Sequence, residues 1–185
     1  MTTPTTAADL RRVALEQFAA SGYLATSIQQ IADAAGVSKA SVLYHYASKE
    51  ALLEAVLAPA LDEIERLIGG FESIRAGKAA RRDFLDGFVG FLIEHRLAAA
   101  IFVNQSSALG ELPIIQRANL LIEGISGHLE RRTDSAEEKM RFGIALAGSA
   151  YLLAQAEHFS HGEALGLEEL RPLLTRILVD LIEGS

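Results

Sequence analysis

Apolar residues along the chain recur at the three- and four-residue spacing of amphipathic helices, and strand-like alternation of apolar and polar residues is absent. Glycines interrupt the pattern where helices are expected to stop, and Pro113 suits a first helical turn. The pattern predicts an all-α protein with helices over residues 7–21, 27–35, 38–46, 49–68, 79–95, 97–108, 113–131, 136–159 and 171–182.

The segment 26–53 predicts two short helices joined by a tight turn. Thr26 or Ser27 is expected to cap the first helix, Gly36 to end it, and Ser38 to cap the second. This is the helix-turn-helix arrangement, whose second helix can lie in the DNA major groove. An ordinary helical hairpin would share this pattern, so the polar residues are what favour DNA binding. The donors on or just after the second helix are Lys39, Ser41, Tyr44, His45 and Lys49.

The same segment resembles a known family. It reads IADAAGVS over residues 31–38 and YHYASKEAL over residues 44–52. In turn, caps and spacing it resembles the DNA-binding domain of the TetR (tetracycline-repressor) family of regulators. The resemblance covers about residues 8–53 and implies an N-terminal three-helix helix-turn-helix DNA-binding domain over 1–48. It further implies a C-terminal helical effector-binding and dimerisation domain over 49–185, which a long helix at about 49–68 links to the first.

The resemblance also implies a role for each residue of the predicted DNA surface. Lys39, Ala40 and Tyr44 fall where family members reach bases. The positions where they hold phosphates are Thr26, Ser27, Ser41, His45 and Lys49. Ser38 completes this surface, as does Leu43, which stands where tyrosine is usual and either meets a thymine methyl or packs inside. Tyr46 replaces a core phenylalanine, so its hydroxyl needs a partner or solvent.

The charge balance adds a constraint on this interpretation. The chain has 17 basic and 24 acidic residues, which gives a net charge of −7. Such acidity argues against coating nucleic acid with general positive charge. Residues 1–50 nevertheless hold four basic and four acidic groups, so the acidity lies in residues 51–185. A neutral DNA-reading head on an acidic body is therefore expected, with DNA binding that is sensitive to salt.

The body contains a candidate pocket for a small, mostly apolar effector. Phe84, Phe88, Phe91 and His95 are spaced to share one helix face, although an aromatic core stripe would look the same. Sparse polar groups in neighbouring apolar segments complete the predicted effector site, which adds Phe102, Gln105, Tyr151 and Gln155.

Other chemistry is weakly represented. His158 and His161 could hold a metal together with Glu157, but Glu157 is not a convincing third ligand. Neither a metal nor a cofactor is therefore predicted. The absence of cysteine excludes a disulfide scaffold and a thiol nucleophile. The scattered histidines nominate no catalytic base, so the chain is not expected to be an enzyme. Without an export signal or an apolar stretch of about 20 residues, a cytoplasmic protein with no membrane partner is expected.

Two late segments suit self-association. Small residues line one face of the helix predicted at 136–159, and leucine and isoleucine cover a face of the helix at 171–182. Both faces could instead be buried within one subunit, but the family resemblance implies a homodimer through these two helices. Pro59, inside the linking helix, predicts a kink that would act as a hinge or merely shape the fold.

The sequence therefore predicts a ligand-responsive transcriptional regulator. It would be a repressor that a small apolar effector releases from a palindromic, double-stranded operator. Two alternatives are a helical small-molecule-binding or signalling protein with a degenerate DNA-binding head and, third, an all-α enzyme.

Overall fold

The computed structural model describes residues 6–69, 77–130, 135–155 and 166–183, and every regular element in these ranges is a helix. This confirms the predicted all-α class and the three short helices at the start of the chain. The helices are α1 (Ala7–Ser21), α2 (Ile28–Ala35), α3 (Lys39–His45), α4 (Lys49–Gly69), α5 (Lys78–Glu94), α6 (Arg96–Gln105), α7 (Pro113–Glu130), α8 (Ala136–Ala154) and α10 (Leu167–Glu183).

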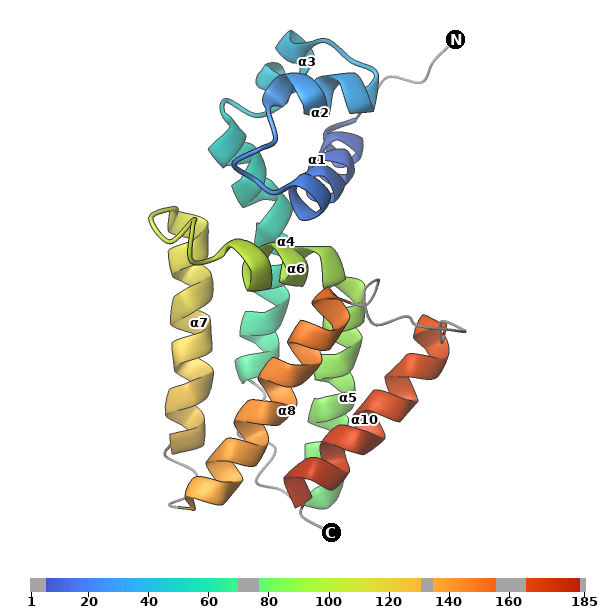
Figure 1. Cartoon of the computed structure of the whole chain (residues 1–185), viewed down its shortest axis with the longest axis vertical. Coiled ribbons are helices and arrows are strands. Elements are labelled where there is room, and N and C mark those ends of the chain that lie inside the picture. Colours follow the sequence, from blue (N-terminus) through green and yellow to red (C-terminus); the bar gives the residue numbers. More distant parts are fainter. Residues whose placement is uncertain (1–5, 70–76, 131–134, 156–165, 184–185) are drawn as a thin grey trace.

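Figure 1 shows that α1, α2 and α3 form a small head at one end of the molecule. The long helix α4 leaves the head and enters a body whose helices α5, α7, α8 and α10 run lengthwise. Helix α6 lies across the body where it meets the head, and the C-terminus lies at the opposite end (Figure 1).

Local capping explains where the head helices begin and end. Thr6 and Asp9 form a capping box at the start of α1, and Ser27 with Gln30 forms another at the start of α2. Gly36 ends α2 with a φ of 68°, a left-handed conformation that other residues adopt at a cost. These contacts fix the sharp turn between α2 and α3.

Two hydrophobic clusters fill the interior. The first joins α1, α2, α3 and α4 and continues into the body through Ala98 and Ile101 of α6 and Ile115 of α7. The second is built from α5, α8 and α10, with Leu85, Phe142 and Leu178 among its members. The first cluster crosses residue 49, where the sequence predicts the domain boundary, so head and body share apolar packing.

Some helix limits differ from the predicted ones. Helix α10 begins four residues earlier than expected, because the carbonyl of Gly166 accepts from the amides of Glu169 and Leu170 and starts the helix there. Pro172 therefore lies inside the helix rather than in its first turn. Helix α8 ends at Ala154, with Gln155 as its C-cap, so the predicted helix is too long there. Residues 156–159 of that prediction lie outside the described residues, as do Glu157, His158 and His161. Helix α4 is continuous through Pro59.

Among the described helices, none has the length and apolarity required to cross a membrane.

Candidate functional site

Helix α3 presents its polar side to solvent. Lys39, Ala40, Ser41, Leu43, Tyr44 and His45 are all exposed. Tyr44 is 86% exposed, whereas Val42 is fully buried in the head. Leu43 is 40% exposed, so it lies on the surface with its polar neighbours rather than in the core. The predicted base-contacting residues thus share the accessible side of one helix.

Tyr46 anchors the end of α3 to the first helix. Its hydroxyl donates to the carbonyl of Ala7 at 2.9 Å and accepts from Nη1 of Arg11 at 3.3 Å. Tyr46 stands where the family usually has phenylalanine, and its hydroxyl therefore has two hydrogen-bond partners inside the protein. This pair of contacts fixes the orientation of α3 against α1.

The serines of the predicted DNA surface also cap helices. Ser38 accepts from the backbone N–H of Ser41 at 3.1 Å, and the two hydroxyl oxygens lie 2.9 Å apart. Ser27 accepts from the N–H of Gln30. All three serines remain exposed. They stand at helix starts, where unpaired N–H groups favour a bound anion such as phosphate.

Thr26 occupies a different position from the one the family resemblance implies. Only 2% of Thr26 is exposed, and its hydroxyl donates to the carbonyl of Gly22 at 2.8 Å. A hydroxyl that is buried and already bonded cannot also hold a phosphate. This corrects the predicted role of Thr26, whose side chain instead fastens the loop between α1 and α2.

Lys49 likewise serves the same loop. Its Nζ donates to the carbonyls of Tyr23 and Thr26, each at 2.9 Å, and lies 4.3 Å from the centroid of the Tyr23 ring. Partial burial lowers the pKa of this lysine below its usual value. Lys49 thus clamps the α1–α2 loop to the start of α4, an interaction that sequence spacing did not indicate. Because an ammonium group has three N–H donors and the two carbonyls use only two of them, the predicted phosphate contact of Lys49 stays a prediction.

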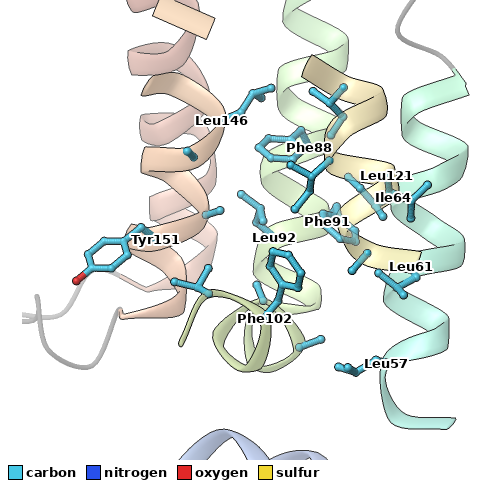
Figure 2. Close-up of a pocket in the computed structure, with 18 of the residues that line it drawn as sticks. Leu57, Leu61, Ile64, Phe88, Phe91, Leu92, Phe102, Leu121, Leu146 and Tyr151 are labelled. Carbon is cyan, nitrogen blue, oxygen red and sulfur yellow. The ribbon is translucent and has the colours of Figure 1, made fainter. Parts of the chain in front are cut away.

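A cavity of about 560 Å³ lies in the body between α4, α5, α6, α7 and α8. Four of the eight predicted effector residues line it, namely Phe88, Phe91, Phe102 and Tyr151. Figure 2 shows Phe88, Phe91 and Phe102 among leucines and isoleucines that extend into the same space. The remaining lining residues are aliphatic or glycine, with Leu61 and Ile64 from α4 and Leu121 from α7 among them.

The other four predicted effector residues do not line this cavity. Phe84 stacks on Phe88 at 6.4 Å between ring centroids, one helical turn away from the space. Gln155 donates to Oδ1 of Asn104 at 2.6 Å. His95 turns toward α4, where its Nε2 lies 2.9 Å from a carboxylate oxygen of Glu63. These side chains make their contacts outside the cavity, because each of their helices packs against more than one neighbouring helix.

His95 also belongs to a cluster of potential metal ligands. Atoms of Glu63, Glu94 and His95 lie within 4.8 Å of one another. The close His95–Glu63 pair already accounts for two members of this cluster, as an ion pair when the histidine is protonated. The sequence alone did not indicate this cluster, since Glu63 lies 32 positions from His95.

Gln105, predicted as an effector residue, instead joins the body to the head. From the end of α6, its Oε1 accepts from the N–H of Tyr23 at 2.6 Å, and its Nε2 donates to the carbonyl of Phe18 at 2.9 Å. The amide thus pairs with two backbone groups at the end of α1. Because α6 also contributes Ala99, Phe102 and Val103 to the cavity wall, one helix connects the cavity to the head.

Comparisons with known proteins agree with this geometry. Residues 10–56 match the family model described as bacterial regulatory proteins, tetR family. The HTH-type transcriptional regulator RutR of Escherichia coli (strain K12) is 33% identical over 121 residues, which form 65% of this chain and 53% of RutR. The HTH-type transcriptional repressor KstR2 of Mycolicibacterium smegmatis is 34% identical over 109 residues, 57% of this chain and 52% of KstR2. The chain therefore spans about half the length of these relatives.

Solved structures share the whole fold. SCO3833 from Streptomyces coelicolor A3, a member of the TetR transcriptional regulator family, has a TM-score of 0.72 at 21% identity, covering 100% of this chain and 92% of its own. The TetR family regulator PfmR from Thermus thermophilus has a TM-score of 0.64 at 20% identity, covering 92% of this chain and 96% of its own. The matched proteins are regulators, in agreement with the prediction that this chain is not an enzyme.

The two lysines of the predicted DNA surface differ in structural role, which stability measurements can test. We expect Lys49→Ala to lower the free energy of unfolding by about 1–3 kcal/mol, because it leaves two loop carbonyls without their charged donor. Lys39→Ala, on the exposed side of α3, should change it by less than about 0.5 kcal/mol. Urea unfolding followed by circular dichroism measures both. Equal stability of the two variants would contradict the clamp.

Proposed function

We propose that this chain, which belongs to the tetR family of bacterial regulatory proteins, is a homodimeric repressor that binds a palindromic operator and is released by a small apolar effector. One observation carries the proposal: helix α6 lines the cavity in the body and is bonded through Gln105 to the end of α1, in the same head that carries α3. Each part of the proposal rests on a separate feature of the chain.

The DNA-binding part rests on α3. Its exposed side offers an ammonium, hydroxyls and an imidazole from Lys39, Ser41, Tyr44 and His45. These groups suit hydrogen bonds to base edges and phosphates in a major groove. A degenerate head would have little reason to keep donors on the exposed side of this helix and rigid anchors, such as Tyr46, on its buried side. The geometry therefore favours an operator-binding head over the alternative of a signalling protein.

The dimer rests on apolar side chains that the body leaves in solvent. Met140, Ile144 and Leu152 of α8 and Ile177 of α10 are all at least 45% exposed. Leu174 and Leu178 of α10 are buried against the body, so only part of the predicted α10 face remains for a partner. Two copies that pair through α8 and α10 would cover this surface. Paired heads would then read half-sites about one DNA turn apart.

The response to an effector rests on Gln105. A ligand in the cavity would press on Ala99, Phe102 and Val103 of α6. Because Gln105 ends the same helix and holds the backbone of Phe18 and Tyr23, displacement of α6 would tilt the head. The ligand releases DNA if it binds this tilted state more tightly than the operator-bound state. This route does not require Pro59 to act as a hinge.

Operator binding can be tested with DNA selected from randomised duplexes by the unaltered chain. Lys39→Ala should lose about 1–3 kcal/mol of preference for that operator over random DNA, because it removes a candidate donor to guanine. The control is Lys78→Ala, which removes the same charge at the opposite end of the molecule, where Lys78 pairs with Glu183. It should leave the preference unchanged. Failure to select any sequence, or equal effects of the two variants, would contradict the proposal.

Oligomeric state tests the dimer surface. The unaltered chain should sediment at twice the 19.9 kDa mass of one chain, and Ile144→Glu or Ile177→Glu should shift it to the monomer by burying an unpaired charge. Leu120→Glu is the matched control, because Leu120 is 67% exposed and belongs to α7, which is not one of the two helices of the proposed interface. Analytical ultracentrifugation gives the masses. Dimers that survive both α8 and α10 substitutions would place the interface elsewhere.

A further inference from the structure

The chemistry of the cavity wall limits the kind of molecule it can hold. Among the residues that the structure describes, the side chains of the wall are aliphatic or aromatic, and only Tyr151 carries a polar group. The Tyr151 hydroxyl points away from the other labelled side chains of the cavity (Figure 2). The backbone polar groups of the wall lie within helices, where they are largely paired with one another. A ligand inside would therefore meet almost no hydrogen-bonding partner.

Two sets of charged groups in the described residues next to the cavity pair with each other. His95, whose ring lies 5.1 Å from the cavity-lining Phe91, faces Glu63 at 2.9 Å. On α4 and α7, Arg117 donates to Asp62 at 2.8 Å and to Glu65 at 2.7 Å. A charged group carried inside the cavity would have to break such a pair or remain unpaired in an apolar space. Both choices cost far more free energy than leaving that charge in water.

We propose that the cavity takes an uncharged, largely hydrocarbon ligand, such as a neutral alcohol, ketone or hydrocarbon, and rejects carboxylates, phosphate esters and ammonium compounds. This inference rests on the proposed function and assigns the chemical class of its effector. Its volume of about 560 Å³ falls within the usual range for sites that hold small molecules. Much smaller apolar cavities, of about 150 Å³, stay dry and take up benzene.

Three ligands of one chain length separate charge from apolar size. Decan-1-ol, decanoate and decyltrimethylammonium are each dialysed to equilibrium against the full-length chain at pH 8, below their micelle concentrations. Decan-1-ol should bind saturably, and both charged analogues should bind at least about 100-fold more weakly. Binding of either charged compound as tightly as the alcohol would overturn the assignment, and so would the lack of saturable decan-1-ol binding.

A pair of variants locates the binding. Ala99 lies on α6 and lines the cavity, so Ala99→Phe should fill part of the space and weaken decan-1-ol binding at least about tenfold. Ala79→Phe places the same side chain at an exposed position in the first turn of α5 and should bind as the unaltered chain does. Equal binding by the two variants would place the alcohol outside the cavity. The comparison of the three ligands uses the unaltered chain and holds whether or not Ala99→Phe folds.

The outcome can be separated from that of the DNA-binding proposal. The dialysis contains no DNA, and operator selection uses the ligand-free chain. Tight decanoate binding together with operator recognition would overturn only the ligand class. Specific decan-1-ol binding without operator recognition would overturn the regulator and leave an apolar carrier of the same ligand class.

Discussion

The amide of Gln105 bonds to both Phe18 and Tyr23, and this contact connects the two parts of the molecule. A primary amide has one carbonyl oxygen and one NH₂ group, so it can satisfy a free N–H and a free carbonyl at the same time. The end of α1 supplies both: the N–H of Tyr23 lies beyond the helix, and the carbonyl of Phe18, which also accepts from the Gly22 N–H at 3.1 Å, has a second lone pair for the amide. The orientation of the head therefore depends on the position of α6, and α6 in turn forms part of the cavity wall.

Neighbouring contacts make the head respond as one piece. Lys49 binds the loop carbonyls from the α4 side, Tyr46 binds α1, and Thr26 is fastened within the loop. With these bonds in place, we expect a shift at Tyr23 to move α1, α2 and α3 together rather than bend the loop alone. The body contrasts with this: its apolar cavity is large, and few directional contacts fill it. The molecule thus combines a head held by directional hydrogen bonds with an apolar cavity in the body, an arrangement that suits the proposed control by an effector.

Local signals in the sequence were enough to predict the head, and long-range contacts explain where prediction failed. The caps at Ser27 and Ser38 and the turn at Gly36 depend on residues within a few positions of each other. Gln105 lies 82 and 87 positions from its partners Tyr23 and Phe18, so the sequence could not show these contacts. The apolar residues next to it in the sequence suggested an effector pocket instead. Helical spacing correctly grouped Phe88 and Phe91, but could not show that His95 on the same face would meet α4. The dimer surface was predicted as whole faces, and packing against α5 leaves only parts of them exposed.

The central claim is that the state of the cavity reaches the head through Gln105, and a double-mutant cycle on operator affinity tests it most directly. Ala99→Phe fills the cavity without a ligand, and Gln105→Ala removes the connection. With Gln105 present, filling the cavity should weaken operator binding by about 1–3 kcal/mol, and in the Gln105→Ala background it should have little further effect. Equal losses of affinity in both backgrounds, or no loss in either, would contradict the account.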